Sequence, residues 1–173
     1  MRTITIELSV ESCNKALKEL EEYRKKLKSA LDEICKRVAE FGLTRAEMYF
    51  EQAPYDGIKD FHLEVKKISG GYSLIANGKT VLFLEFGAGV HYQNDHPKAG
   101  EMGIEHGTYG RGLGKNDYWF YTGQPGTAGG ELAYGHKNTT ITHGNPASMP
   151  MYKSSKEMRA EIKRIAEEVF SKF

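Results

Sequence analysis

The feature that most constrains this chain is a long apolar stripe at helical spacing near its N-terminus. Lys and Glu fill the opposite face. Ser9 or Ser12 is a suitable N-cap, and Gly42 stands where a left-handed C-terminal cap would be expected. The pattern predicts one amphipathic helix of about 30 residues that begins near residue 11. The stripe consists of Leu17, Leu20, Leu27, Leu31, Ile34, Val38 and Phe41.

A helix of this length spans about 45 Å, which is more than a small sheet covers. Part of the stripe is therefore expected to contact another helix or another subunit. We expect most of it to pack on the protein's own sheet, and a coiled coil is the weaker alternative because only about four heptads are present. Cys13 and Cys35 would lie about 30 Å apart at the helix ends, too far for a disulfide, so reduced thiols are expected.

Short alternating runs predict strands on both sides of the helix. Asn77-Gly78 favours a two-residue type I′ turn and predicts a hairpin between residues 72–76 and 80–86. Connections this short make the neighbouring strands antiparallel. The other expected strands are residues 3–8, 46–50, 61–65, 118–121 and 139–142.

The region between residues 87 and 144 holds 14 of the 19 glycines and five of the six histidines, which indicates irregular loops. A second apolar stripe, from Met158 to Phe170, predicts a closing helix of about 18 residues capped by Ser154 or Ser155. The expected class is α+β, with both helices packed on an antiparallel sheet of about four to six strands. We expect a single domain over 1–173 with a Gly/His-rich insertion at about 87–138.

Charge and hydropathy exclude some classes of partner. Lys and Arg number 24 against 23 Asp and Glu, so bulk charge does not attract the chain to nucleic acid or anionic lipid. No stretch reaches the roughly 18 apolar residues that a membrane span needs, and the opening residues lack the core of a signal peptide. We expect synthesis in the cytosol and no membrane partner.

The histidines are the first candidates for chemistry. His91 and His96 are five residues apart without the spacing of a helical metal site, so no metal and no cofactor are expected, and both are predicted to be solvated or at an interface. No nucleophile motif is present, and catalytic residues are not expected. Glu85 is expected to accept amide hydrogens at a strand end. The aromatic residues Tyr118, Trp119 and Tyr121 favour packing in the core or at an interface.

Two segments carry a family resemblance. Residues 82–90, Leu-Phe-Leu-Glu-Phe-Gly-Ala-Gly-Val, are similar to a strand that ends in an E-[FY]-G-[TS]-G turn. Residues 142–152 are similar to a G-x-x-[PA]-x-P-F-[ML] segment that precedes a helix. Together, and in this order, they resemble the minor tail, tail-completion or head-tail joining proteins of long-tailed bacteriophages. The chain departs from a minimal member of this family in its long insertion.

The resemblance implies a structural virion protein and not an enzyme. It implies a ring of about six or more copies, assembled in the host cytoplasm, that completes the tail or neck. The partners would be further copies, the tail tube or tail terminator protein and the head connector or adaptor proteins, with DNA passing through the ring without specific binding. A non-viral assembly or binding module is one alternative, and a metal-dependent hydrolase using the His-rich loop is another. The residues given an architectural role are Glu85, Phe86, Gly87, Gly89, Gly144, Pro146 and Pro150.

Overall fold

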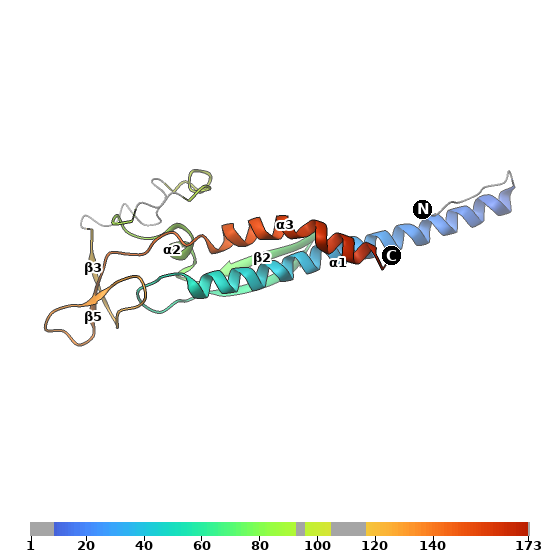
Figure 1. The fold of residues 1–173 in the computed structure, drawn as a ribbon. Coiled ribbons are helices and arrows are strands. Elements are labelled where there is room, and N and C mark those ends of the chain that lie inside the picture. Colours follow the sequence, from blue (N-terminus) through green and yellow to red (C-terminus); the bar gives the residue numbers. More distant parts are fainter. Residues whose placement is uncertain (1–8, 93–95, 105–116, 173) are drawn as a thin grey trace.

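The computed structural model describes residues 9–92, 96–104 and 117–172. The molecule is elongated, with one long helix, α1, running along most of its length (Figure 1). The C-terminal helix, α3, lies beside the second half of α1. A two-stranded hairpin also packs on α1, and a three-stranded sheet forms the end farthest from the start of α1. The expected α+β class is confirmed, with the strands divided between two antiparallel sheets.

Helix α1 spans Val10–Gln52 and is longer than expected. Ser9 caps it, because its side-chain oxygen accepts a hydrogen bond from the Ser12 amide. The predicted stop at Gly42 is wrong, since Gly42 is a buried position inside the helix where an added Cβ would meet Met158 of α3. The helix ends just before Pro54, which has no amide hydrogen to continue the ladder.

The predicted strand at 46–50 is also wrong, because these residues form the last turns of α1. Ala46 and Phe50 are four residues apart, so they share one helical face, and both are fully buried. The ring of Phe50 stacks on that of Phe61, with the centroids 4.9 Å apart. Packing on both sides of α1 thus favours a helix at residues 46–50, although their alternating pattern also fits a strand.

Strands β1, His62–Ile68, and β2, Gly71–Asn77, are antiparallel and confirm two expected strands. They pair through a turn in which Gly70 has a φ of +89°. The predicted hairpin at Asn77-Gly78 is wrong, because the next run forms a short helix, α2, Val81–Phe86. Thr80 places this helix by donating its amide and hydroxyl hydrogens to the Asp60 carbonyl.

The second sheet has the order β3-β5-β4. Its strands are β3, Trp119–Thr122, β4, Glu131–Leu132, and β5, Thr139–Thr142. The strands expected at 118–121 and 139–142 are confirmed as β3 and β5. The short helix η1, Gly100–Met102, lies in the region expected to be an irregular insertion. The strand expected at residues 3–8 lies outside the described residues.

Helix α3, Pro150–Phe170, confirms the closing helix but begins earlier than expected. Its caps are not Ser154 or Ser155, because both lie inside the helix and donate to the carbonyl oxygens of Gly42 and Tyr152. Pro150 occupies the first helical turn and follows Met149, whose φ is +56°. The core lies where the end of α1, the hairpin, α2 and the start of α3 meet.

Both cysteines are free and exposed. Cys35 lies inside α1 and not at its end as expected, because the helix continues to Gln52. In the part of the chain that the structure describes, no helix has the length and apolar character of a membrane span.

Candidate functional site

The two segments that carry the family resemblance meet in space. The short loop after α2 pairs with the segment before α3 through Ala88 and Asn145, whose backbones exchange hydrogen bonds of 2.9 and 3.2 Å. The Asn145 side chain donates to the Phe83 carbonyl, and the Ser148 amide donates to the Leu84 carbonyl. Asn145 is fully buried. We call this contact between residues 83–89 and 143–152 the motif junction.

Glycine is required on both sides of the motif junction. Gly87, Gly89 and Gly144 have φ values of +77°, +83° and +91°, which side chains adopt at a cost. A Cβ at Gly144 would clash with the Ala88 carbonyl oxygen, and one at Gly89 would lie 2.7 Å from the His143 carbonyl oxygen. The positive φ values are one reason for glycine at these positions, and the close approach of the two backbones is a second.

Glu85 is buried and connects α2 to α3. Its two carboxylate oxygens accept hydrogen bonds from the amides of Met151 and Tyr152, at 2.8 and 2.9 Å. The first amides of a helix have no partner within it, and a negative charge there also interacts favourably with the helix dipole. Glu85 therefore accepts amide hydrogens as expected, but its expected place at a strand end is wrong, because it lies in α2 and caps a helix that begins 65 residues later.

His96 completes this arrangement. Its Nε2 lies 2.9 Å from Glu85 Oε1, and its Nδ1 accepts a hydrogen bond from the Lys98 amide. Nε2 must therefore carry the hydrogen that is donated to the carboxylate. The ring also contacts Phe86 and Tyr152, and the residue is only 6% exposed. His96 was expected to be solvated or at an interface, but it is a buried partner of Glu85.

A pocket of about 320 Å³ lies beside the motif junction, and Trp119 and Tyr121 of β3 line one side of it. Asp56, which also lines it, was missed in the sequence. Its carboxylate accepts hydrogen bonds from the Gly126 and Ala128 amides and the Thr142 hydroxyl. These bonds fix the loop after β3 against β5, and the Asp-Gly pair at 56–57 was the available signal. Burial raises the pKa of the neighbouring Tyr55 hydroxyl.

The aromatic residues expected at an interface lie on the three-stranded sheet. Tyr118, Trp119 and Phe120 are 41%, 39% and 58% exposed. We call these three residues the aromatic end. Tyr121 is less exposed, and its hydroxyl donates to the Gln124 carbonyl at 2.5 Å. The sheet that carries them is at the opposite end of the molecule from the start of α1 (Figure 1).

His91 lies just beyond the motif junction, close to Asp117 and His143. Three potential ligand atoms, one from each side chain, are within 4.8 Å of one another. This is the group of metal-ligating side chains found in the described part of the chain. It differs from the pairing considered in the sequence, because His96 is engaged with Glu85 while His91 is exposed.

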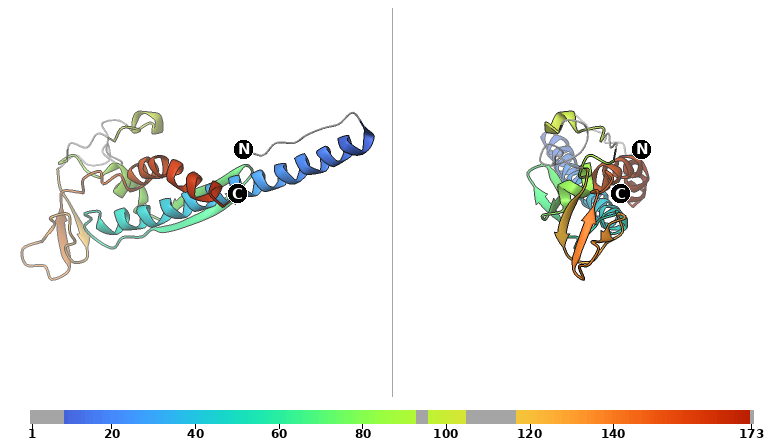
Figure 2. Two further views of the ribbon diagram at one scale, coloured as in Figure 1. Left: turned by 45° about the vertical axis from the view of Figure 1, so that its right-hand side comes forward. Right: turned by 90° about the vertical axis from the view of Figure 1, so that its left-hand side faces the viewer.

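The first part of α1 forms a second candidate region. Residues 10–24, which we call the arm, extend beyond both the hairpin and α3 (Figures 1 and 2). Val10, Leu17 and Leu20 on the arm are 80%, 58% and 49% exposed. Ala16 of the arm is only 5% exposed, so the exposed apolar stripe of the arm consists of Val10, Leu17 and Leu20.

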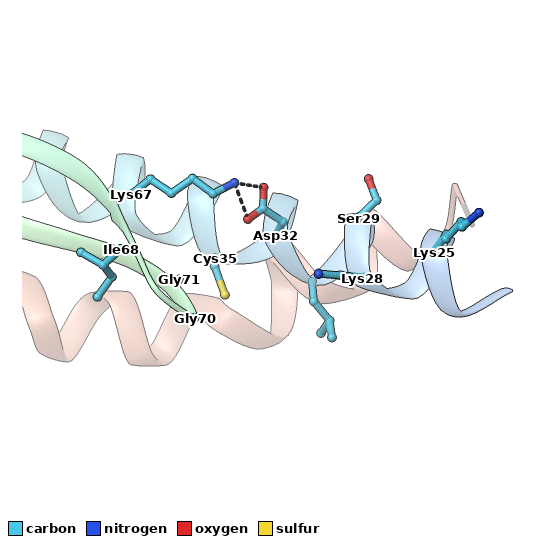
Figure 3. Close-up of a pocket in the computed structure, with 10 residues that line it drawn as sticks. Lys25, Lys28, Ser29, Asp32, Cys35, Lys67, Ile68, Gly70 and Gly71 are labelled. Atoms are coloured by element: carbon cyan, nitrogen blue, oxygen red, sulfur yellow. Dashed lines mark hydrogen bonds and ion pairs between the residues drawn. The ribbon is translucent and has the colours of Figure 1, made fainter. Parts of the chain in front are cut away.

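An open groove of about 630 Å³ lies between α1 and the turn of the hairpin, where the arm leaves the fold. Asp32 of α1 and Lys67 of β1 form an ion pair of 2.9 Å across it (Figure 3). The hydrogen bond from Lys67 lowers the pKa of Asp32, and the same bond raises the pKa of Lys67. Lys25 and Lys28 of α1 also line the groove.

No model of a known protein family, no curated protein and no solved structure matches this chain.

Proposed function

We propose that this protein is a ring-forming structural subunit of a long bacteriophage tail, placed where the tail meets the head. The observation that carries the proposal is the arm, which holds leucines on a helix that projects past the rest of the subunit. Exposed apolar stripes of this kind on a rigid element mark surfaces that bind protein. A subunit built to be covered by its neighbours explains why the first third of a long helix lies outside the fold that the described residues make.

The motif junction supports an architectural role. Each segment that resembles the phage family is used for a backbone contact or a helix cap, and the Glu85 carboxylate is fully engaged with α3 and His96. A catalytic acid or base needs access to a substrate, whereas Glu85 is 6% exposed. The junction thus fixes how the closing helix leaves the loop region.

The shape of the subunit suits a head-to-tail ring. Such a ring requires two different surfaces, so that one surface of each copy meets the other surface of the next. The arm and the aromatic end are two such surfaces, at opposite ends of the molecule. A net charge of +1 keeps the repulsion between repeated copies small. The tail tube or terminator and the head connector would bind the two faces of the ring.

The test is negative-stain imaging of the purified protein, alone and after addition of tail tubes. We expect rings, either in the pure protein or at the ends of the tubes. The arm is tested with Leu17→Ser/Leu20→Ser, which should abolish rings. The control is Lys15→Gln/Glu22→Gln, which changes the opposite face of the same helical turns and leaves the net charge unchanged. Its rings should remain intact.

Two results would overturn the proposal. One is a protein that stays monomeric at high concentration and does not bind tubes. The other is a ring that forms equally well with the serine variant, because the arm would then have no part in assembly.

A further inference from the structure

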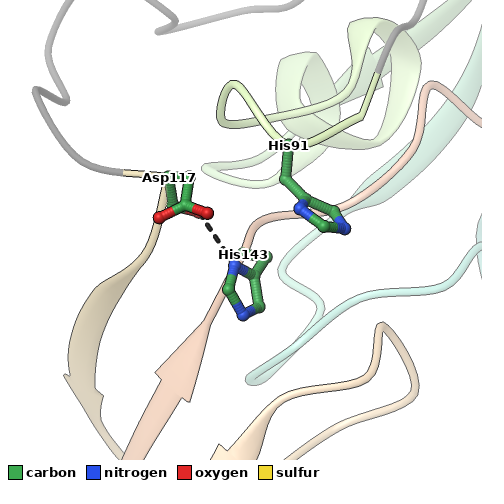
Figure 4. Close-up of side chains that lie close together, drawn as sticks. All are labelled: His91, Asp117 and His143. Atoms are coloured by element: carbon green, nitrogen blue, oxygen red, sulfur yellow. Dashed lines mark hydrogen bonds between the residues drawn. The ribbon is translucent and has the colours of Figure 1, made fainter.

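The cluster of His91, Asp117 and His143 is placed by backbone pairing in three separate segments (Figure 4). His91 follows the Gly89 turn, which the Ala88–Asn145 bridge holds against the end of β5. Asp117 precedes β3 and His143 follows β5. Because Trp119 pairs with Thr142, Asp117 and His143 lie diagonally across the end of the sheet. The cluster is thus fixed by the fold, although the residues are far apart in sequence.

The side chains also contact one another. The two imidazole rings have centroids 4.8 Å apart, and His143 Nδ1 lies 3.0 Å from the Asp117 carbonyl oxygen. One nitrogen or carboxylate oxygen from each residue lies within 4.8 Å of the others. His91 and Asp117 are exposed, so an ion has access from solvent.

We propose that His91, Asp117 and His143 bind one divalent transition-metal ion of the Zn²⁺ class. Two imidazole nitrogens and one carboxylate oxygen form a ligand set that suits Zn²⁺, with water in the fourth position. Bond lengths of about 2.0–2.2 Å place tetrahedral ligands about 3.4 Å apart, so atoms that now lie up to 4.8 Å apart need to close by up to about 1.4 Å. Rotation of the exposed His91 and Asp117 side chains supplies this movement.

Ion binding changes one hydrogen bond. A carbonyl oxygen accepts only, so His143 Nδ1 carries the hydrogen in the present arrangement. If the ion binds at Nδ1, that proton is exchanged through solvent and the ring becomes the tautomer protonated at Nε2. The ring stays neutral, and the Asp117 carboxylate offsets part of the charge of the ion. The hydrogen bond is lost and a metal bond replaces it.

The bound ion would tie the loop after α2 to the ends of β3 and β5. These are the segments that flank the motif junction and lead to the aromatic end. The site is open, with three protein ligands, which also leaves a position for a ligand from a neighbouring protein. It does not depend on the arm, so it can be present or absent whether or not the protein forms rings.

The experiment is a calorimetric titration of Zn²⁺ into untagged, chelator-treated protein, followed by Co²⁺ absorption spectra. We expect one ion per chain and a tetrahedral Co²⁺ spectrum. His91→Ala and His143→Ala should each weaken Zn²⁺ binding by roughly 100-fold, and Asp117→Asn by at least about 10-fold. His136→Ala changes an exposed histidine outside the cluster and should bind as the wild type does.

The circular dichroism of each metal-free variant checks that it is folded. The proposal is wrong if folded wild-type protein shows no binding up to millimolar Zn²⁺. It is also wrong if His91→Ala and His143→Ala bind as tightly as His136→Ala does. Imaging of the same variants keeps the test of the metal site apart from the test of ring formation. A variant that loses metal binding but still forms rings leaves the proposed role of the arm unaffected.

Discussion

The arm and the second half of α1 carry apolar stripes of the same helical period but have different surroundings. In the second half, Ala39, Ala46 and Phe50 are buried against α3, the hairpin and α2. In the arm, Leu17 and Leu20 remain about half exposed. The same sequence pattern therefore serves two purposes. The second half holds the subunit together, and in our proposal the arm offers a surface to a neighbour.

This difference separates stability from assembly. The residues that stabilise the fold are concentrated around the core and the motif junction, where buried polar groups are matched by partners. The arm contributes its helix but little tertiary packing from the described residues. Changes near the junction should lower the free energy of unfolding, while changes on the arm should act on assembly.

The largest effect is expected at Glu85. Glu85→Ala leaves two helix amides and the His96 ring without their acceptor in a buried site, which should lower the free energy of unfolding by about 3–5 kcal/mol. Glu85→Gln keeps one acceptor oxygen and should cost about 1–2 kcal/mol. Urea unfolding measures both. Glu131→Ala, at an exposed site, is the control and should change stability by less than about 0.5 kcal/mol.

The next effect concerns the close approach of the two motif backbones. Gly144 and Gly129 have similar φ values, +91° and +94°, but an added Cβ meets backbone only at Gly144. Gly129→Ala should cost about 1–2 kcal/mol for the conformation alone. Gly144→Ala should cost roughly 1–3 kcal/mol more because the Ala88 carbonyl must move. If both variants lose the same free energy of unfolding in urea, the motif junction is less tightly packed than described.

A smaller effect is expected at the ion pair where the arm leaves the fold. Hydrogen bonding to Lys67 holds the pKa of Asp32 below 3.8, and hydrogen bonding to Asp32 holds that of Lys67 above 10.5. The contribution of Asp32 to the free energy of unfolding is present above pH 3.8, and it is lost as the pH falls through the pKa of Asp32 in the folded protein. The contribution of Lys67 to the free energy of unfolding is present below pH 10.5, and it is lost as the pH rises through the pKa of Lys67 in the folded protein. Both groups are exposed, so solvent screens the pair.

Lys67→Met should therefore be slightly less stable than the wild type at pH 7, and the difference should disappear at both pH extremes. Urea midpoints over this range measure it. Lys66→Met, at the neighbouring exposed position of β1, is the matched control. A difference between Lys67→Met and wild type that does not vary with pH would exclude the ion pair as its source.

The smallest effect on global stability is expected at the start of the arm. Ser9→Ala removes the N-cap of α1, a change that costs about 1 kcal/mol in a helix that unfolds with the protein. Here the first turns can fray by themselves, so the global loss should be below about 0.5 kcal/mol. Amide exchange near residues 11–14 should nevertheless become faster. A loss of the full 1 kcal/mol or so in the free energy of unfolding, measured with urea, would mean that the arm unfolds together with the core.

The elements with a strong local period were predictable from the sequence. The apolar stripes gave both long helices, and the alternating runs gave β1, β2, β3 and β5. Two errors came from runs that fit more than one structure. Residues 46–50 continue α1 because α3 and Phe61 pack on them, and residues 81–86 form α2 because their apolar residues face a core on one side.

The candidate sites were harder to predict because they depend on contacts between distant segments. The sequence singled out Glu85 but not its role, since the amides that it caps lie 66 and 67 residues away. His91 was noted, yet its neighbours Asp117 and His143 are brought to it by strand pairing and not by spacing. The exposure of the arm could be anticipated in part, because the stripe was too long for a small sheet to cover.

The most direct test of the division between fold and assembly is the mass in solution, by sedimentation, of the wild type, Leu17→Ser/Leu20→Ser and Lys15→Gln/Glu22→Gln. Urea unfolding is measured on the same samples. The account predicts that the serine variant loses the assembled species while its unfolding midpoint matches that of the other two chains. A serine variant that assembles normally, or one that unfolds in step with its loss of assembly, would contradict it.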